Sequence, residues 1–150
     1  MAKHPRWVRK FVSEVELDAV ARAIAEVEAV SSAEVRVHLD HRCPGEAMAQ
    51  AVGVFERLGM HRTALRHGVL IYVAIADRKL AVIGDQGIHA RVGDEYWRGL
   101  VVTITGEFRQ GHPGDGLVTA VRDLRDVLAT HFPRRPDDQN ELSDEVSIGP

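Results

Sequence analysis

Two apolar runs separated by a short link constrain this chain more than any other feature. Val69–Ile75 is apolar almost without interruption, which is typical of a strand buried on both faces. The second run, Leu80–Ile83, begins after the four residues Ala76–Lys79. This link is too short for a helical crossover, so the second strand must return antiparallel as a hairpin. The chain leaves it through Gly84–Gly87, an acidic loop flanked by glycines, where we expect function.

Length and charge limit the classes of protein to consider. A chain of 150 residues fits one domain with its own core. The chain has 19 Lys and Arg residues against 22 Asp and Glu, so it has no excess of positive charge that would favour binding to nucleic acid. The single cysteine, Cys43, excludes an intrachain disulfide. No apolar signal core follows the N-terminus, and no segment approaches the roughly 18 apolar residues of a membrane span. We expect a cytoplasmic protein without a membrane span.

The segments before the hairpin predict helix, strand and helix. Ser13-Glu14-Val15-Glu16 is a capping-box pattern and opens an amphipathic helix to about Ala29. Glu34–Leu39 alternates and predicts a strand with one less buried face. Pro44 suits the start of a helix that ends at Gly59. Its inward residues are predicted to be Met48, Val52 and Phe55.

Two further helices follow the hairpin, from Asp94 to near Gly111 and from Pro113 to before Pro133. The element order predicts a three-layer α/β/α sandwich around a small mixed β-sheet. The domain is expected to span residues 13–132, between an N-terminal extension (1–12) and an acidic tail (133–150).

Connection lengths also predict which residues share an end of the sheet. The first two strands are joined through a helix and should be parallel, whereas the third runs against the second. Asp85 should therefore lie at the same end as Glu34, Arg66 and His67. The opposite end collects Asp40, His41 and Asp77.

Glu34 and Asp85 are the first candidates for a Ca²⁺ or Mg²⁺ site, because hard cations prefer oxygen ligands. If the apolar residues of the tail dock it beside Asp85, the tail acids Glu141, Asp144 and Glu145 complete the site. Alternatively, Asp85 is only a turn or cap residue, Glu34 is a solvated strand end and the tail is solvated.

Other chemistries find less support in the sequence. His38, His41 and Cys43 do not have the spacing of standard zinc ligands, and Cys43 is expected to be a structural thiol. No Ser/His/Asp set can be assigned, so no catalytic residue is predicted.

Several motifs, in order, resemble those of the TPM domain family, which includes thylakoid-lumen proteins tied to photosystem II repair and many bacterial proteins. The resemblance runs from about Ser13 to Phe132, and the closing residues resemble the ending of a short, stand-alone bacterial subgroup. The motifs are Arg66-His-Gly-Val-Leu-Ile-Tyr-Val-Ala74, Asp77-Arg-Lys79, Gly84-Asp-Gln-Gly-Ile88, Phe108-Arg-Gln-Gly111, Gly116-Leu-Val118 and Asp137–Gly149.

The resemblance implies an α/β/α sandwich, divalent-cation binding, usually of calcium, and acid phosphatase activity proposed for some members. Asp85 and Gly87 match the family segment after the third strand, and Glu34 matches the acid of the first strand. Many members carry Asp-Asn-Gly where this chain has Arg66-His67-Gly68. The change removes an acidic ligand and adds a positive neighbour, which weakens a calcium site.

Three hypotheses follow. The preferred one is a domain that binds a divalent cation, expected to be calcium, and serves as a regulatory or interaction module with an unknown protein partner. The second is a metal-dependent phosphatase acting on phosphate esters, in which Arg66 or His67 holds phosphate or handles a proton. The third is a structural or partner-binding domain without a metal.

Overall fold

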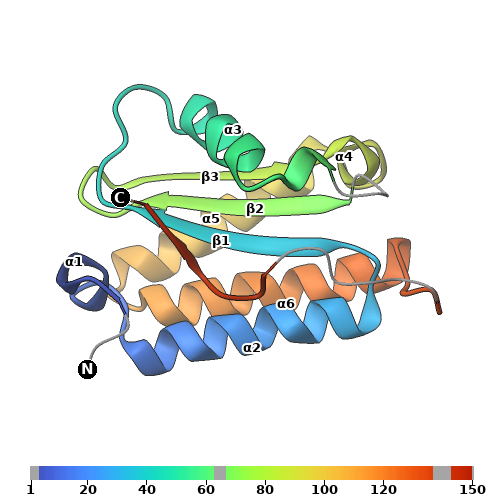
Figure 1. Ribbon diagram of the computed structural model, residues 1–150, viewed down its shortest axis with the longest axis horizontal. Helices are drawn as coiled ribbons and strands as arrows, with labels where there is room; N and C mark the ends of the chain where they lie inside the picture. Colours follow the sequence, from blue (N-terminus) through green and yellow to red (C-terminus); the bar gives the residue numbers. More distant parts are fainter. Residues whose placement is uncertain (1–3, 63–66, 137–142, 150) are drawn as a thin grey trace.

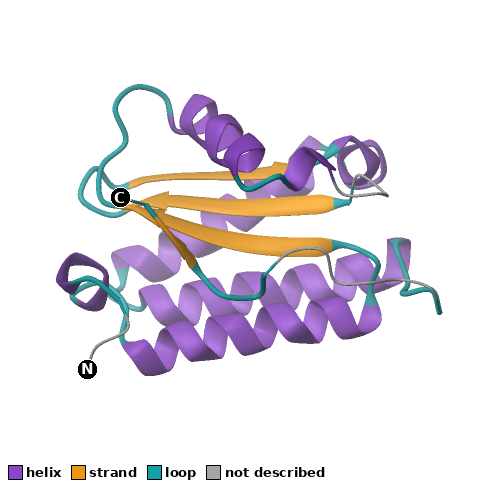
Figure 2. Ribbon diagram, in the orientation of Figure 1, coloured by secondary structure: helices purple, strands orange, loops and turns teal. Residues whose placement is uncertain are grey.

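Four strands form a mixed sheet between two layers of helices, which confirms the predicted α/β/α sandwich (Figures 1 and 2). The computed structural model describes residues 4–62, 67–136 and 143–149. The strand order is β3-β2-β1-β4. The strands are β1 (Glu34–Asp40), β2 (Gly68–Ala74), β3 (Lys79–Gly84) and β4 (Ser147–Ile148).

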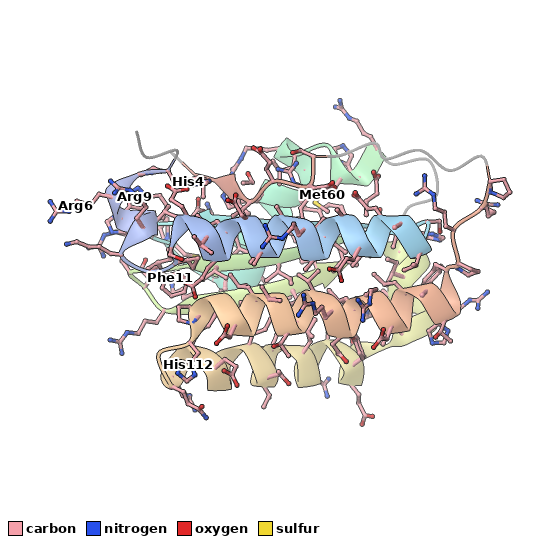
Figure 3. The ribbon with its side chains drawn as sticks, turned by 90° about the horizontal axis from the view of Figure 1, so that it is seen from below. His4, Arg6, Arg9, Phe11, Met60 and His112 are labelled. Atoms are coloured by element: carbon pink, nitrogen blue, oxygen red, sulfur yellow. The ribbon has the colours of Figure 1, made fainter. Side chains whose placement is uncertain are left out.

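Three long helices cover one face of the sheet, as the lower layer of Figure 1 shows. Figure 3 views this layer from below, with His4 and Arg9 at the end where the chain enters it. The opposite face carries α3 and a short 3₁₀ helix, η1. The helices are α1 (Arg6–Arg9), α2 (Glu14–Val30), α3 (Ala47–Arg57), η1 (Met60–Arg62), α4 (Gln86–Val92), α5 (Asp94–Arg109) and α6 (Pro113–His131).

The start of α2 shows how the sequence determines local structure. The Ser13 hydroxyl accepts from the Glu16 amide at 3.1 Å, and the Glu16 carboxylate accepts from the Ser13 amide at 2.9 Å. This capping box satisfies two amides that the first turn leaves without helical partners. Leu17, Val20 and Ile24 then face the core and are at most 2% exposed. The predicted capping box and inward face are both confirmed.

The register of the sheet confirms the predicted strand directions. β1 runs parallel to β2, with Glu34 opposite Gly68 and Asp40 opposite Ala74. β2 runs antiparallel to β3, with Val69 opposite Gly84. Glu34 and the chain leaving β3 therefore lie at one end of the sheet, and Asp40 lies at the other.

Two local expectations are wrong. Gly84–Gly87 is not a loop, because α4 begins at Gln86 and the Asp85 carboxylate caps it by accepting from the Gln86 amide at 2.7 Å. Met48 and Val52 do not face the core. The predicted difference between the two faces of β1 is confirmed, since Arg36 on the polar face is partly exposed and the apolar face is fully buried.

Helix α3 begins at Ala47, a few residues after Pro44, and Glu46 at its N-cap position makes no side-chain capping bond. Its buried residues are Ala51, Val54 and Phe55, which lie three and four positions apart. Met48 and Val52 are 52% and 44% exposed, since they occupy the neighbouring stripe of the helix. Of the predicted inward residues, only Phe55 is confirmed.

Both chain ends pack onto the domain. In the N-terminal extension, Val8 and Val12 are buried in the main core. In the tail, Val146 is buried and β4 pairs parallel with β1 at His38 and Leu39. The described part of the tail, residues 143–149, therefore docks on the domain. That its acids complete a site with Asp85 stays a prediction. β4 pairs with the edge of β1 that β2 leaves open. It therefore lies at the opposite edge of the sheet from β3, with β1 and β2 between them.

Candidate functional site

Glu34 and Asp85 lie at the same end of the sheet, on either side of Gly68. The Glu34 amide donates to the His67 carbonyl at 3.0 Å, and the Asp85 amide donates to the Gly68 carbonyl at 2.8 Å. Because β2 lies between them, their main chains are two strand spacings, about 10 Å, apart. A Cβ at position 68 would lie 3.5 Å from side-chain carbons of both Met60 and Phe55. Apolar atoms thus cover Gly68 between the two acids.

Each of these acids has a place in the fold. Both are 5% exposed, and both have interaction partners, so neither is an isolated buried carboxylate. Capping is the resolved role of Asp85. Its role as a metal ligand stays a prediction.

Two other predicted site residues, His67 and Glu145, contact different parts of the fold. His67 Nδ1 lies 3.1 Å from the Ser32 hydroxyl, and the His67 ring packs 4.3 Å from the Phe132 ring, between centroids. Glu145 is exposed, and its carbonyl accepts from Arg36 Nη2 at 3.4 Å. Arg66 and Glu141 lie outside the described residues, so the roles predicted for them stay predictions.

An acid that the sequence analysis missed, Glu28, forms a pair with Asp144. Glu28 lies near the end of α2 and is 1% exposed. Both of its carboxylate oxygens and Asp144 Oδ1 are buried and accept no hydrogen bond from the described residues. Burial, followed by the neighbouring Asp144 carboxyl, raises the pKa of Glu28 to about 9. The structure therefore holds an acid that is neutral at pH 7 unless a cation replaces its proton.

The surroundings of this pair contain charges of both signs. The Glu34 carboxylate further raises the pKa of Glu28, whereas Arg134 lowers it. Burial lowers the pKa of Arg36, while Asp144 and Glu28 raise it, so its guanidinium belongs to the same cluster. Among the described residues, no group of three or more His, Cys, Asp and Glu side chains could hold a metal by itself. A cation here would take two carboxylates and further oxygens from main chain or water.

The signal for Glu28 was present in the sequence. Glu28 follows Ile24 by four positions and therefore lies on the buried stripe of α2. A carboxylate on an apolar stripe is rarely buried unless it has a partner. That partner, Asp144, lies more than a hundred residues away in the chain, which is why the pair was not recognised.

A second polar network lies at the opposite end of β1. The Tyr72 hydroxyl donates to Asp40 Oδ2 at 2.8 Å, and His38 Nε2 lies 2.8 Å from Asp40 Oδ1. On the other side of the ring, His38 Nδ1 lies 2.9 Å from the Ser147 hydroxyl. Burial lowers the pKa of His38 and raises that of Tyr72. The histidine is therefore neutral at pH 7.

The residues weighed for zinc are not brought together. The His41 ring stacks on Trp7 at 5.1 Å, between centroids, while His38 belongs to the network with Asp40. Cys43 is buried, and its thiol donates to the Gly45 carbonyl at 3.8 Å. This is the setting of a structural thiol.

The fold and sequence together define the class of this protein. It belongs to the TPM domain family, whose model matches residues 8–127. The chain is 37% identical to the BA42 protein of the psychrophilic bacterium Bizionia argentinensis, whose NMR structure gives a TM-score of 0.85. That match covers 93% of this chain and 96% of the BA42 chain.

A more distant likeness concerns the fold alone. The N-terminal domain of a P. gingivalis protein, solved by NMR, gives a TM-score of 0.68 at 16% identity. It covers 81% of this chain and 79% of that chain. No curated protein matches the sequence. None of the described helices is long and apolar enough to cross a membrane.

Proposed function

We propose that this TPM domain binds a divalent cation, calcium or magnesium, between Glu28 and Asp144, and acts as a regulatory or interaction module. The observation that supports it is the pair of buried Glu28 oxygens without hydrogen-bond partners among the described residues, beside a second carboxyl. A buried carboxylate without partners is costly. Either a proton or a cation can remove that cost, and hard cations favour carboxylate oxygens.

The two proposed ligands come from different parts of the fold. Glu28 belongs to α2, whereas Asp144 belongs to the tail that continues into β4. A cation held by both would join the tail to the body of the domain. The module could then present a different surface with and without the ion.

Calorimetric titration of the whole chain with CaCl₂, and separately with MgCl₂, tests the proposal. Glu28→Gln and Asp144→Asn keep side-chain size but remove a charged ligand, so each should weaken binding at least tenfold. Glu145→Gln is the matched control, since Glu145 is the neighbouring tail acid and its side chain is exposed. This variant should bind like the wild type.

Asp85→Asn separates this site from the end of the sheet beside Gly68. Binding that survives Asp85→Asn and is lost in Glu28→Gln supports the proposed pair. Loss in Asp85→Asn with unchanged binding in Glu28→Gln would show that the ion sits beside Asp85 and that the proposal is wrong. The proposal would also be contradicted if the wild type bound neither calcium nor magnesium.

The phosphatase hypothesis gains no residue from the described structure. His67, one of its candidates, contacts Ser32 and Phe132. Phosphatase activity therefore stays a prediction that rests on the family resemblance.

A further inference from the structure

A hydrogen-bonded chain of four side chains crosses three strands at the carboxyl end of β1. Tyr72 comes from β2, Asp40 and His38 from β1, and Ser147 from β4. Asp40 lies two residues after His38 on the same face of β1, and Ser147 is paired directly with His38 across the strands. The serine is brought there only because the tail docks.

The donors in this chain determine where each proton lies. Tyr72 is neutral at pH 7 and donates to Asp40. A carboxylate oxygen only accepts, so His38 Nε2 carries the proton of the bond to Asp40 Oδ1. The neutral ring then has a lone pair on Nδ1, and the Ser147 hydroxyl donates to it. This is the order of nucleophile, base and orienting carboxylate that activates a serine.

The chain of bonds adjoins an open depression. Asp40 lines a cavity of about 490 Å³ together with His41, Arg42, Gln50 and Arg57. The Arg57 charge is close enough to help lower the pKa of His38. Ser147 is only half-buried, on a strand at the edge of the sheet. Positive charge from Arg42 and Arg57 thus lies at the Asp40 end of the chain of bonds.

We propose that Ser147, His38 and Asp40 form a hydrolytic site for carboxylic esters, with Ser147 as nucleophile, His38 as general base and Asp40 as positioning residue. Ser147 Oγ attacks the ester carbonyl while its proton passes to His38 Nδ1, and the carbonyl π electrons move to the oxygen.

Collapse of this intermediate breaks the bond to the alcohol oxygen, which takes the proton from His38 and leaves. Water then attacks the acylated serine and gives a proton to His38 Nδ1. The second collapse releases the carboxylic acid, and the proton returns to Ser147 Oγ. One ester and one water become one acid and one alcohol.

Asp40→Asn separates activation of the serine from simple fastening of the tail. Asparagine can accept from Tyr72 through its oxygen and donate through its nitrogen to His38 Nε2. The histidine proton is then forced onto Nδ1, which donates to Ser147 instead of accepting. The tail keeps its hydrogen bond in this variant, but the serine loses its base.

The experiment treats the whole chain with an alkyl fluorophosphonate, which phosphonylates activated serines with loss of fluoride, and locates the adduct by peptide mass mapping. The wild type should be labelled at Ser147, and Ser147→Ala should not. Asp40→Asn should be labelled at least tenfold more slowly, while amide exchange at residues 146–149 stays as slow as in the wild type. Ser143→Ala is the control in the same tail and should be labelled at the wild-type rate.

Turnover of 4-nitrophenyl acetate should follow the same pattern among these variants. The proposal is wrong if Ser147 is labelled no faster than Ser143 in the wild type, or if Asp40→Asn is labelled at the wild-type rate. Labelled Ser147 without any ester turnover above the Ser147→Ala background also overturns the assignment as a hydrolytic site.

Discussion

At the residue scale, two buried acids of this domain have different environments. Asp85 is held by the amide of Gln86 at the start of α4. The Glu28 carboxylate accepts no hydrogen bond from the described residues, and its neighbour is another acid. The difference lies in the partners that the fold supplies, because both side chains are at most 5% exposed.

The raised pKa of Glu28 predicts how stability depends on pH in the absence of divalent ions. The folded-state pKa is about 9 against an ordinary value of 4.5. Between these values the folded chain binds more protons than the unfolded chain, so the free energy of unfolding falls as the pH rises. The contribution is fully present below pH 4.5 and is lost as the pH passes through about 9.

Urea denaturation in chelator at pH 5.5 and 8.5 measures this dependence. The wild type should lose stability between the two pH values more steeply than Glu28→Gln, whose amide does not titrate. Glu26→Gln, on the same helix but with a partly exposed side chain, should keep the wild-type slope. Equal slopes for wild type and Glu28→Gln would rule out a buried, protonated Glu28.

At the scale of elements, the contact between β3 and α5 depends on the absence of a side chain. A Cβ at Gly84, the last residue of β3, would collide with the Trp97 ring of α5. Trp97 is itself buried at 7% exposure and donates from its indole nitrogen to His89 Nδ1 at 3.2 Å. The ring therefore has little freedom to move aside.

The same substitution should have opposite effects at two glycines of this pair of elements. Gly84→Ala should destabilise the domain by about 1–3 kcal/mol through overpacking. Gly99→Ala, in the middle of α5 with nothing within 4 Å of the added Cβ, should stabilise it by about 0.5–1 kcal/mol. Chemical denaturation measures both. A neutral Gly84→Ala would show that α5 shifts away from β3 without cost.

At the scale of the whole molecule, the tail protects an edge of the sheet. β4 pairs with only two residues of the seven-residue β1, and the preceding tail residue, Val146, is buried against the main core. The opposite edge, β3, has α3 and α5 packed against its faces (Figure 1). The tail therefore contributes both apolar burial and cover for an edge that could pair with another chain.

Removal of residues 143–150 should destabilise the domain by about 1–3 kcal/mol, the order expected for burying one valine and its neighbours. It should also promote association, because the β1 edge becomes available for pairing. Thermal melting and light scattering across a range of protein concentrations measure the two effects. Val146→Ala is the control that lowers stability and leaves the edge covered. A truncated chain with the wild-type melting temperature would contradict this role.

Local sequence patterns were sufficient for much of the architecture. The capping box at Ser13, Pro113 at the start of α6 and the short link between β2 and β3 predicted elements and strand directions that the structure confirms. Helix α4 was missed because its seven residues are too few for a helical period to stand out beside the glycines. The inward face of α3 was misplaced by one stripe because Met48 and Val52 are apolar but exposed.

The sequence by itself determined the sandwich, the parallel pairing of β1 and β2 and the end of the sheet shared by Glu34 and Asp85, since these depend on local periodicity and connection length. Only the tertiary structure decided where the tail lies. Its docking on β1 brings Asp144 to Glu28 and Ser147 to His38 across more than a hundred residues. No local pattern encodes such pairs, because they arise from which edge of the finished sheet is free.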